Sequence, residues 1–549
     1  MAADSDPTGS GRVERTPAVG PIGATHPNPC AAQYRAAGYW PQQRLGEMFA
    51  CTVARLPLHD AIIDGTRRLT FHDLDRLSKG VACGLSTLGF GAGDVIAYQL
   101  PNWWEAAVTF LAAVRLGATV NPLLPIFREA ELRFTLRQSG AQALVIPGVL
   151  RGCDHRELIR ALRDDLPALR EVFVARDTAA PGMRDFNALL DPPPSTGVAP
   201  DVDPDAIALL MYTSGTTAQP KGVLHTHNSL AAEVLSLERV HQLTAADRTL
   251  MPSPLTHISG VLHGILSPAL LGTSAVLMER WDPPRALELI ASERVTYMVG
   301  APTFLQDLLS ASESKPGDYH SLRLFSCGGA GVSPVLMQRA RARFRNCVAK
   351  RVYGSTEFPT LTTTDAADAL THGIGSEGRP IWPAEVRIAD EAGTALPAEA
   401  EGEVQGRGPE CFAGYLEATL NTDSFTPDGW FRTGDLGVID RAGYLRITGR
   451  LKEIIIRKGE KISVKEVEDA IAAHPAVAEV AVVPRPDANT GERACAVVRL
   501  RPGMRVDLAA LTAFLGAQGL AKQKWPEQLD VVDDFPRTDS GKIVRAKLK

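Results

Sequence analysis

The chain has 549 residues, of which 45% are hydrophobic and 22% are charged, and its formal net charge is −5. This length exceeds what one hydrophobic core serves, so we expect two or more domains, and the absence of a basic surplus argues against a nucleic-acid partner. The eight cysteines are scattered without a C-x-x-C pair, which favours a reduced, cytoplasmic compartment over a disulfide scaffold.

Helices and strands alternate along the first part of the chain. Residues 1–29 are rich in proline, glycine and serine without a continuous apolar stretch, which predicts a disordered tail rather than a signal peptide. A hairpin at 64–73 leads into a helix, and apolar strands follow at 95–100, 118–121 and 143–146. This alternation predicts an α/β fold with stacked layers and a largely parallel sheet.

The second part continues the pattern and then changes. Residues 206–211 predict a buried strand, and a helix is expected from about Ser229. The uncharged segment 260–278 contains a proline and three glycines, which favours a buried helix, a turn and a strand over a transmembrane segment. Short strands with glycine turns between 385 and 449 predict a small β-rich subdomain, and residues from about 452 onward predict a small α+β domain.

The segment 212–222, YTSGTTAQPKG, carries the strongest chemical signal in the chain. It leaves a predicted buried strand and offers hydroxyls and backbone N–H groups to an anion, while Lys221 adds a positive charge. A polyphosphate is therefore the natural ligand. The segment lacks the G-x-x-x-x-G-K-[ST] spacing of a Walker P-loop.

Four further patterns suit a nucleotide. In the segment 353–357, Thr356 can bind a phosphate and Glu357 can hold Mg²⁺, which prefers oxygen ligands. Asp435 ends a glycine turn and can accept the ribose hydroxyls. Residues 449–463 join a basic start to a glycine turn, and Lys542 stands in a Ser-Gly turn near the C-terminus. Each pattern alone also fits an ordinary turn or a solvated surface, so their weight comes from their occurrence together.

In this order, the five patterns resemble the adenylate-forming superfamily, which contains acyl-CoA synthetases, luciferases and the adenylation domains of peptide synthetases. The resemblance covers the chain from about Tyr39 to its end. It implies an AMP-binding N-terminal domain at 30–449 and a mobile C-terminal domain at 450–549, with a hinge near Lys452. It also implies activation of a carboxylate by ATP and Mg²⁺ to an acyl adenylate, followed by acyl transfer to coenzyme A. Peripheral membrane contact and a homodimer stay open.

The resemblance assigns roles to individual residues. The catalytic group comprises Lys542, Thr356, Glu357 and Lys221, with Glu357 as the metal ligand. The ligands of the β- and γ-phosphates would be Thr213, Ser214, Gly215, Thr216, Thr217 and Lys221. The rest of the nucleotide would contact Gly328, Gly329, Ala330, Tyr353, Gly354, Thr356, Asp435, Arg450 and Lys542. Lys458 and Gly459 would border the coenzyme A tunnel.

The acyl pocket would be lined by His257, Ile258, Gly260, Val261, Ser326, Cys327 and Gly331. No acidic residue occurs between 251 and 261, which argues against an amino-acid substrate. Ile258 stands where aryl-acid ligases usually have asparagine, although the segment 37–40 (AGYW) resembles those ligases. We expect a medium-chain aliphatic, alicyclic or aromatic monocarboxylate, with fatty-acid and cyclohexanecarboxylate-CoA ligases as the nearest resemblance.

Three alternatives stay open at this point. The first is an acyl- or aryl-AMP ligase that loads a carrier protein, and the second is a luciferase-like oxygenase. The third is a non-catalytic nucleotide-binding protein, which the presence of both Glu357 and Lys542 argues against.

Overall fold

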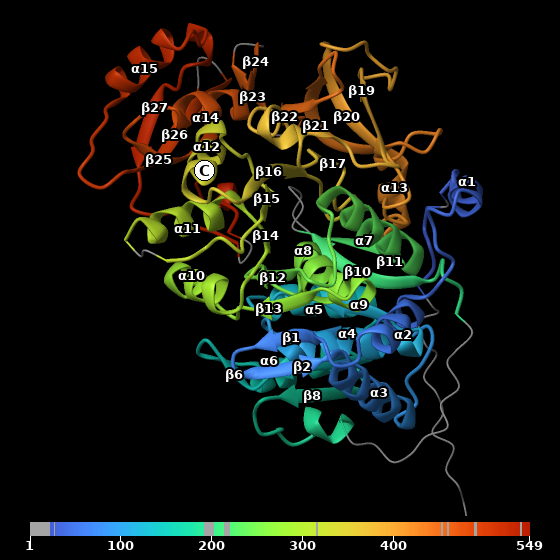
Figure 1. Ribbon diagram of the computed structural model, residues 1–549. Helices are drawn as coiled ribbons and strands as arrows, with labels where there is room; N and C mark the ends of the chain where they lie inside the picture. The colour runs from blue at the N-terminus through green and yellow to red at the C-terminus, as the bar shows by residue number, and fades with distance from the viewer. Residues whose placement is uncertain are drawn as a thin grey trace, which may run out of the picture.

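The computed structural model describes residues 22–26, 28–190, 202–213, 220–314, 317–451, 454–457, 460–487, 491–538 and 541–548. Within these ranges, two large β-sheets with helices on their faces form the first part of the chain (Figure 1). A smaller antiparallel sheet and a C-terminal sheet follow.

One large sheet has the strand order β11-β10-β4-β3-β5-β8-β9. Its strands are parallel except for β10 and β11, which pair antiparallel. The bounds are β3 Val95–Tyr98, β4 Thr119–Pro122, β5 Ala143–Pro147, β8 Glu171–Ala175, β9 Arg184–Asp185, β10 Ile207–Thr213 and β11 Lys221–Thr226. Most central strands are buried over their whole length, as expected for parallel strands covered on both faces.

The other large sheet has the order β18-β17-β16-β15-β14-β12-β13-β1-β2. The run from β1 to β16 through β13, β12, β14 and β15 is parallel, and β2, β17 and β18 add antiparallel pairings at the edges. The bounds are β1 Asp60–Asp64, β2 Arg67–Thr70, β12 Arg248–Met251, β13 Ser274–Leu277, β14 Tyr297–Gly300, β15 Leu324–Gly328, β16 Val348–Tyr353, β17 Thr362–Thr363 and β18 Arg379–Pro380. A short hairpin of β6 (Val149–Leu150) and β7 (Cys153–Asp154) stands apart.

The helices begin and end where local chemistry predicts. For example, Thr70 caps α3 by accepting a hydrogen bond from the Asp73 backbone N–H, and Gly117 ends α4 in the left-handed region at φ 70°. The bounds are α1 Ala31–Ala36, α2 Leu45–Arg55, α3 Phe71–Thr87, α4 Trp104–Leu116, α5 Glu129–Ser139, α6 His155–Leu162, α7 His227–His241, α8 Ile258–Gly260, α9 Ser267–Leu271, α10 Pro283–Ser292, α11 Pro302–Ser314, α12 Pro334–Arg343, α13 Asn421–Ser424, α14 Val464–Ala472 and α15 Leu508–Ala517. A π-helix, Val261–Leu266, connects α8 to α9.

The largest hydrophobic cluster joins the two large sheets. It contains Ile62 and Ala275 from one sheet, Ile96 and Val120 from the other, and residues of α3, α4 and α7. These helices therefore bury their apolar faces between the sheets, which fixes the carboxyl ends of the parallel strands relative to one another. The predicted buried helix and strand at 260–278 are confirmed as the π-helix, α9 and β13.

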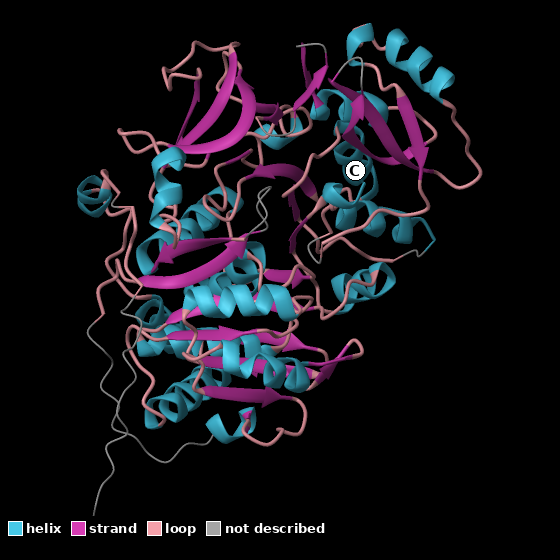
Figure 2. Cartoon of the chain, turned by 180° about the vertical axis from the view of Figure 1, so that it is seen from behind, coloured by secondary structure: helices cyan, strands magenta, loops and turns pink. Residues whose placement is uncertain are grey.

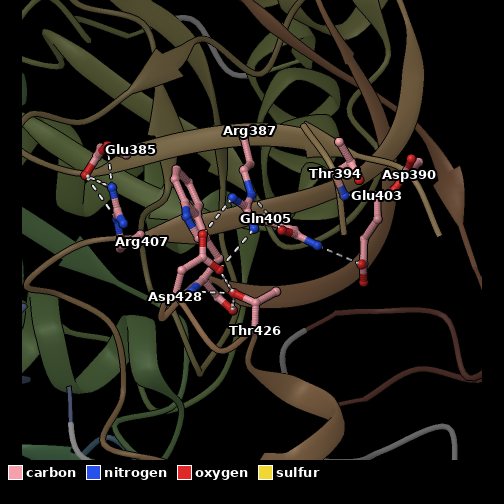
Figure 3. A network of polar contacts seen from close by, with 10 residues as sticks. Glu385, Arg387, Asp390, Thr394, Glu403, Gln405, Arg407, Thr426 and Asp428 are labelled. Atoms are coloured by element: carbon pink, nitrogen blue, oxygen red, sulfur yellow. Dashed lines mark hydrogen bonds and ion pairs between the residues drawn. The ribbon is translucent and has the colours of Figure 1, made fainter. Parts of the chain in front are cut away.

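A smaller antiparallel sheet has the order β19-β20-β21-β22, formed by β19 Glu385–Ala389, β20 Glu401–Arg407, β21 Phe431–Ile439 and β22 Leu445–Arg450. Figure 3 shows polar contacts across it, including the Arg407–Glu385 ion pair and the hydrogen bond from Arg387 to Gln405. The guanidinium groups of Arg387 and Arg407 each lie 4.5 Å from the Trp430 ring centroid. These contacts support the start of β21, which leads to Asp435.

The C-terminal sheet has the order β24-β23-β26-β25, with β27 beside β26. Strands (magenta) and helices (cyan) of this part lie at the upper right of Figure 2, near the C-terminus. Its bounds are β23 Ile454–Arg457, β24 Glu460–Ser463, β25 Val477–Asp487, β26 Gly491–Leu500 and β27 Gln528–Val531. Helices α14 and α15 pack on it around a separate hydrophobic cluster that includes Val467 and Leu511. The predicted fold class, a large α/β part with a β-rich subdomain and a small α+β C-terminal part, is confirmed.

The predicted disordered tail at residues 1–29 lies mostly outside the described residues and stays a prediction. Within it, the Thr25 and His26 backbone N–H groups donate to the Ala413 carbonyl, and the His26 ring stacks on Phe425 at 3.7 Å. Composition could not reveal these contacts, because they are made with residues almost 400 positions away. Throughout the described ranges, no helix is long and apolar enough to span a membrane.

Candidate active site

Lys542 lies in a C-terminal turn that reaches the N-terminal sheets. The turn is closed by hydrogen bonds from the Thr538 backbone N–H to the Lys542 carbonyl at 2.8 Å and from the Lys542 N–H to Thr538 Oγ1 at 3.1 Å. The Lys542 side chain extends to Gly329, where an added Cβ would lie 3.2 Å from Lys542 Cε. Gly329, at φ 78°, thus permits this close approach at the end of β15.

Lys542 is half-buried, and its ammonium lies in a charged environment. Burial lowers its pKa below the ordinary lysine value and Arg450 lowers the pKa further, whereas Glu357 and Asp435 raise it. Burial, with a smaller contribution from nearby Lys542, lowers the pKa of His257 to about 3. The structure therefore brings together Lys542, Glu357, Asp435, Arg450 and His257, which are far apart in the sequence.

Asp435 is held by two of the predicted nucleotide residues. The Tyr353 hydroxyl donates to Asp435 Oδ2 at 2.7 Å, and Arg450 Nε lies 2.8 Å from Oδ1. Asp435 and Arg450 are partners across β21 and β22. The predicted glycine turn before Asp435 is wrong, because Gly434, with φ 73°, lies within β21 at a register irregularity against β20. The carboxylate is thus fixed at the end of a rigid strand pair.

Glu357 has a partner that the sequence did not indicate. The Tyr415 hydroxyl donates to Glu357 Oε1 at 2.7 Å, and Lys221 Nζ lies 4.7 Å from the centroid of the Tyr415 ring. Tyr415 connects the phosphate loop to the metal-binding candidate, since it also bridges β11 through Val223. A lone tyrosine in a segment without chemical spacing gave no signal in the sequence.

The backbone of Thr356 contacts a buried histidine, His225. His225 Nε2 lies 2.8 Å from the Thr356 carbonyl oxygen, which can only accept, so Nε2 carries the proton and Nδ1 is free to accept from Ser229 Oγ at 3.2 Å. Burial lowers the pKa of His225 to about 4, so the ring is neutral near pH 7. The backbone of the 355–357 turn is therefore tied to β11.

Two buried carboxyl groups influence each other in the interior. Glu233 of α7 and Glu410 have no exposed surface, and Ser236 Oγ donates to Glu410 Oε1 at 2.6 Å. Burial raises the pKa of Glu410 to about 7, and burial together with the Glu410 charge raises the pKa of Glu233 well above the ordinary value. Both groups are therefore drawn toward the protonated state. The sequence did not predict this pair.

The predicted acyl-pocket residues lie on different elements, with one group around α8 and the π-helix and another at the end of β15. His257 caps α8, and its ring nitrogen Nδ1 lies 3.0 Å from Ser259 Oγ. Ile258 and Val261 are buried, and Gly260 leaves no room for a side chain because an added Cβ would lie 1.9 Å from the Pro254 carbonyl oxygen.

Ser326 and Cys327 belong to different environments, because successive strand residues face opposite sides of a sheet. Ser326 Oγ lies 3.4 Å from His241 Nε2. Cys327 instead packs in a hydrophobic cluster with Phe325 and Met298. Gly331 and Ala330 are exposed at the end of β15. The structure thus does not bring Cys327 and Ser326 to one surface.

Glycines at two other predicted positions are required by packing. An added Cβ at Gly328 would lie 2.3 Å from the Val352 carbonyl oxygen, and one at Gly354 would lie 2.2 Å from the Pro359 carbonyl oxygen.

Thr213 and Lys221 are register partners on β10 and β11, so the two ends of the phosphate loop meet. The other predicted residues, Ser214, Gly215, Thr216, Thr217, Lys452, Lys458 and Gly459, lie outside the described residues.

Two family models match the chain. The model of the AMP-binding enzyme family matches residues 49–416, and that of the AMP-binding enzyme C-terminal domain matches residues 466–542. The chain belongs to the AMP-binding enzyme family. As a member of this adenylate-forming superfamily, it is an enzyme of the AMP-forming acid–thiol ligase type.

Three relatives of this AMP-binding enzyme show the range of the family. A medium-chain fatty-acid–CoA ligase of Escherichia coli is 36% identical over 94% of this chain and 92% of the relative. A salicyl-AMP ligase/salicyl-S-ArCP synthetase of Mycobacterium tuberculosis is 33% identical over 95% and 94% of the two chains. The crystal structure of ATP-bound MatB from Rhodopseudomonas palustris has a TM-score of 0.83 at 28% identity, covering 92% of this chain and 98% of that one. The family and the ATP-bound neighbour support ATP binding by this chain.

Proposed function

We propose that the protein activates a monocarboxylic acid with ATP to an acyl adenylate, releasing pyrophosphate, and transfers the acyl group to coenzyme A with release of AMP. The acid is a medium-chain aliphatic, alicyclic or aromatic monocarboxylate. The observation that carries this proposal is that the C-terminal turn brings Lys542 to Gly329, at the carboxyl end of β15, where the charges of Glu357 and Asp435 act on its ammonium.

In the first half-reaction, a carboxylate oxygen of the acid bonds to the α-phosphorus, and the bond from that phosphorus to the oxygen bridging to the β-phosphorus breaks. Negative charge collects on the phosphoryl oxygens in the transition state, so a fixed ammonium lowers the barrier. Lys542 would supply this charge, while Thr213 and Lys221 would hold the departing pyrophosphate. Asp435, oriented by Tyr353 and Arg450, would accept the ribose hydroxyls.

The donor set near Glu357 fits Mg²⁺. In nucleotide enzymes, Mg²⁺ is typically held by one or two carboxylates together with substrate phosphates, so a cluster of protein ligands is not required. The described residues contain no group of three or more metal-binding side chains. Glu357, oriented by the Tyr415 hydroxyl, would be that carboxylate. The bound ion would neutralise phosphate charge.

In the second half-reaction, a thiolate sulfur bonds to the acyl carbon, and the bond from that carbon to the adenylate oxygen breaks to release AMP. Residues 450–549 would form the mobile unit, with the hinge near Lys452, and would rotate to exchange Lys542 for a thiol tunnel bordered by Lys458 and Gly459. One site would then serve two reactions in turn.

A carrier-protein thiol is the alternative acceptor. It is favoured by the 33% identity with the salicyl-AMP ligase/salicyl-S-ArCP synthetase. The two acceptors share the first half-reaction, so they differ only in which thiol supports turnover.

The test is a screen for pyrophosphate release with aliphatic, alicyclic and aryl acids, each with and without coenzyme A. We expect acid-dependent release that becomes multiple-turnover when coenzyme A is added, with formation of the acyl-CoA. Multiple turnover with a phosphopantetheinylated carrier protein and not with coenzyme A would support the alternative acceptor. Absence of acid-dependent release with every acid would overturn the proposed function.

A further inference from the structure

Four polar side chains meet in the interior between α7, the π-helix, β14 and β15. This distal polar cluster comprises His241, His263, Tyr297 and Ser326, whose exposed fractions are 3%, 4%, 0% and 1%. The Tyr297 ring centroid lies 5.5 Å from that of His241 and 5.4 Å from that of His263. His241 Nε2 lies 3.4 Å from Ser326 Oγ, so the four side chains form one continuous group.

The cluster contains polar atoms whose hydrogen-bonding capacity is unused. Tyr297 Oη, His241 Nδ1 and His263 Nδ1 are buried without a well-formed hydrogen bond to any described residue. Leaving such a group unsatisfied is costly, because it loses the hydrogen bonds that water makes with it in the unfolded chain. Native interiors rarely keep several of these groups together without a ligand, water or functional reason.

The cluster is uncharged near neutral pH. Burial lowers the pKa of His263 to about 4 and, with Lys350, lowers that of His241 well below the ordinary value. Burial raises the pKa of the Tyr297 hydroxyl, an effect that nearby Ser326 partly offsets. Lys350 Nζ donates hydrogen bonds to the carbonyl oxygens of Thr364 at 2.6 Å and Val240 at 3.3 Å, so these bonds already engage its ammonium. A neutral hydrogen-bonding group therefore suits the cluster better than an anion.

The position of the cluster relates it to the candidate active site. Tyr297 pairs with Leu324, and Val299 pairs with Ser326, so Tyr297 and Ser326 lie on adjacent parallel strands that run toward Gly329 and Lys542. At about 3.3 Å per strand residue, Gly329 lies roughly 10 Å beyond Ser326 and roughly 16 Å beyond Leu324. The cluster thus lies deep in the fold, below the point where a carboxylate would be activated.

Apolar side chains pack with the cluster, although charged groups also act on it. Tyr297 belongs to the large hydrophobic cluster that also contains Leu230, Val234, Val261, Leu262 and Val299. Charges of Arg323, Glu233 and Asp247 act on Tyr297 from outside the four side chains. A mainly apolar environment with a few convergent polar groups is typical of a small-molecule site. His263 projects from a π-helix, a conformation that is rare in proteins and frequent at functional sites.

We propose that the acid carries an uncharged hydrogen-bonding group, a hydroxyl or an oxo group, at the end remote from its carboxylate, and that the distal polar cluster binds this group. This inference rests on the proposed function and narrows its substrate class. Tyr297, His241 and His263 supply hydrogen-bonding atoms that can match either oxygen function, and the apolar surroundings contact the carbon skeleton.

The test compares matched acids in the pyrophosphate-release assay. Octanoate, decanoate and dodecanoate are each paired with their ω-hydroxy and ω-oxo derivatives. We expect the wild-type protein to show at least a tenfold higher kcat/KM for the oxygenated acid at one or more chain lengths. Tyr297→Phe should reduce this ratio about tenfold, because the phenolic hydroxyl that contacts the oxygen is removed.

Tyr319→Phe is the matched control, since Tyr319 is a buried tyrosine in a different hydrophobic cluster and should leave the ratio unchanged. Thermal unfolding of the Tyr297→Phe variant gives a second readout. The melting temperature should stay the same or rise, because the variant removes a hydroxyl that has no well-formed hydrogen bond.

Two results would overturn the inference: equal kcat/KM for plain and oxygenated acids at every length, or a Tyr297→Phe variant that loses stability while its ratio is unchanged. Either can occur while plain acids still drive pyrophosphate release, which leaves the proposed function intact. Absence of release with every acid would instead contradict the proposed function and this inference together.

Discussion

Replacing Lys542 by alanine removes the ammonium that the C-terminal turn brings to Gly329. A unit charge about 4 Å from a developing charge contributes about 4 kcal/mol at an effective dielectric constant of about 20. Loss of that interaction from the transition state corresponds to a decrease of about a thousandfold in the rate of adenylate formation. The second half-reaction should change little, because Lys542 would act on the phosphate in the first.

The assay measures the half-reactions separately, as pyrophosphate release from acid and ATP and as acyl-CoA formation from supplied acyl adenylate and coenzyme A. Lys547→Ala is the matched control, because Lys547 is an exposed lysine of the same C-terminal segment and should leave both rates unchanged. Equal loss of both half-reactions in Lys542→Ala would refute the assignment of Lys542 to the first step.

Other substitutions test the supports of the site. Gly541→Ala should slow adenylate formation about tenfold, because Gly541 has φ 82° and an added Cβ would lie 2.6 Å from Thr303 Oγ1. Gly519→Ala has the same backbone strain at φ 81° without a neighbour within 4 Å, so a rate loss as large as that of Gly541→Ala would contradict the steric explanation. Tyr353→Phe should raise KM for ATP about tenfold through loss of the hydrogen bond to Asp435, and an unchanged KM would argue against the ribose role. Burial raises the pKa of Glu410 from 4.5 to about 7, so its contribution to stability is fully present below pH 4.5 and is lost as the pH rises through about 7. Between pH 4.5 and about 7, the melting temperature of Glu410→Gln should therefore fall less than that of the wild type, by on the order of 2–3 °C. Identical melting temperatures of wild type and variant across this pH range would contradict the buried-acid interpretation.

The sequence predicted the fold from local signals. Apolar strands, helix caps and glycine turns depend on neighbouring residues, so the strands at 95–100, 118–121 and 143–146 were located from their own composition. The candidate nucleotide residues were also found, because Thr356, Glu357 and Asp435 stand in short patterns with recognisable chemistry. Their roles stay predictions, whereas the electrostatic effect of Glu357 and Asp435 on Lys542 follows from the structure.

Contacts between distant segments could not be predicted in this way. Tyr415 meets Glu357 across 58 residues, and Ser326 meets His241 across 85 residues, and no local pattern marks either pair. The opposite orientation of Cys327 follows from strand alternation once β15 is placed, but the sequence leaves open which face is the pocket side. The contacts of His26 with Phe425 likewise depend on tertiary packing.

The most direct test of the central claim follows oxygen from the acid to the nucleotide. The protein is incubated with ATP, coenzyme A and an acid labelled with oxygen-18 in its carboxylate, and the products are analysed by mass spectrometry. Adenylate formation predicts one labelled oxygen in AMP, because the carboxylate oxygen that bonds to the α-phosphorus stays there when the thiol displaces AMP. Unlabelled AMP, or label in inorganic phosphate together with ADP, would contradict the proposed reaction.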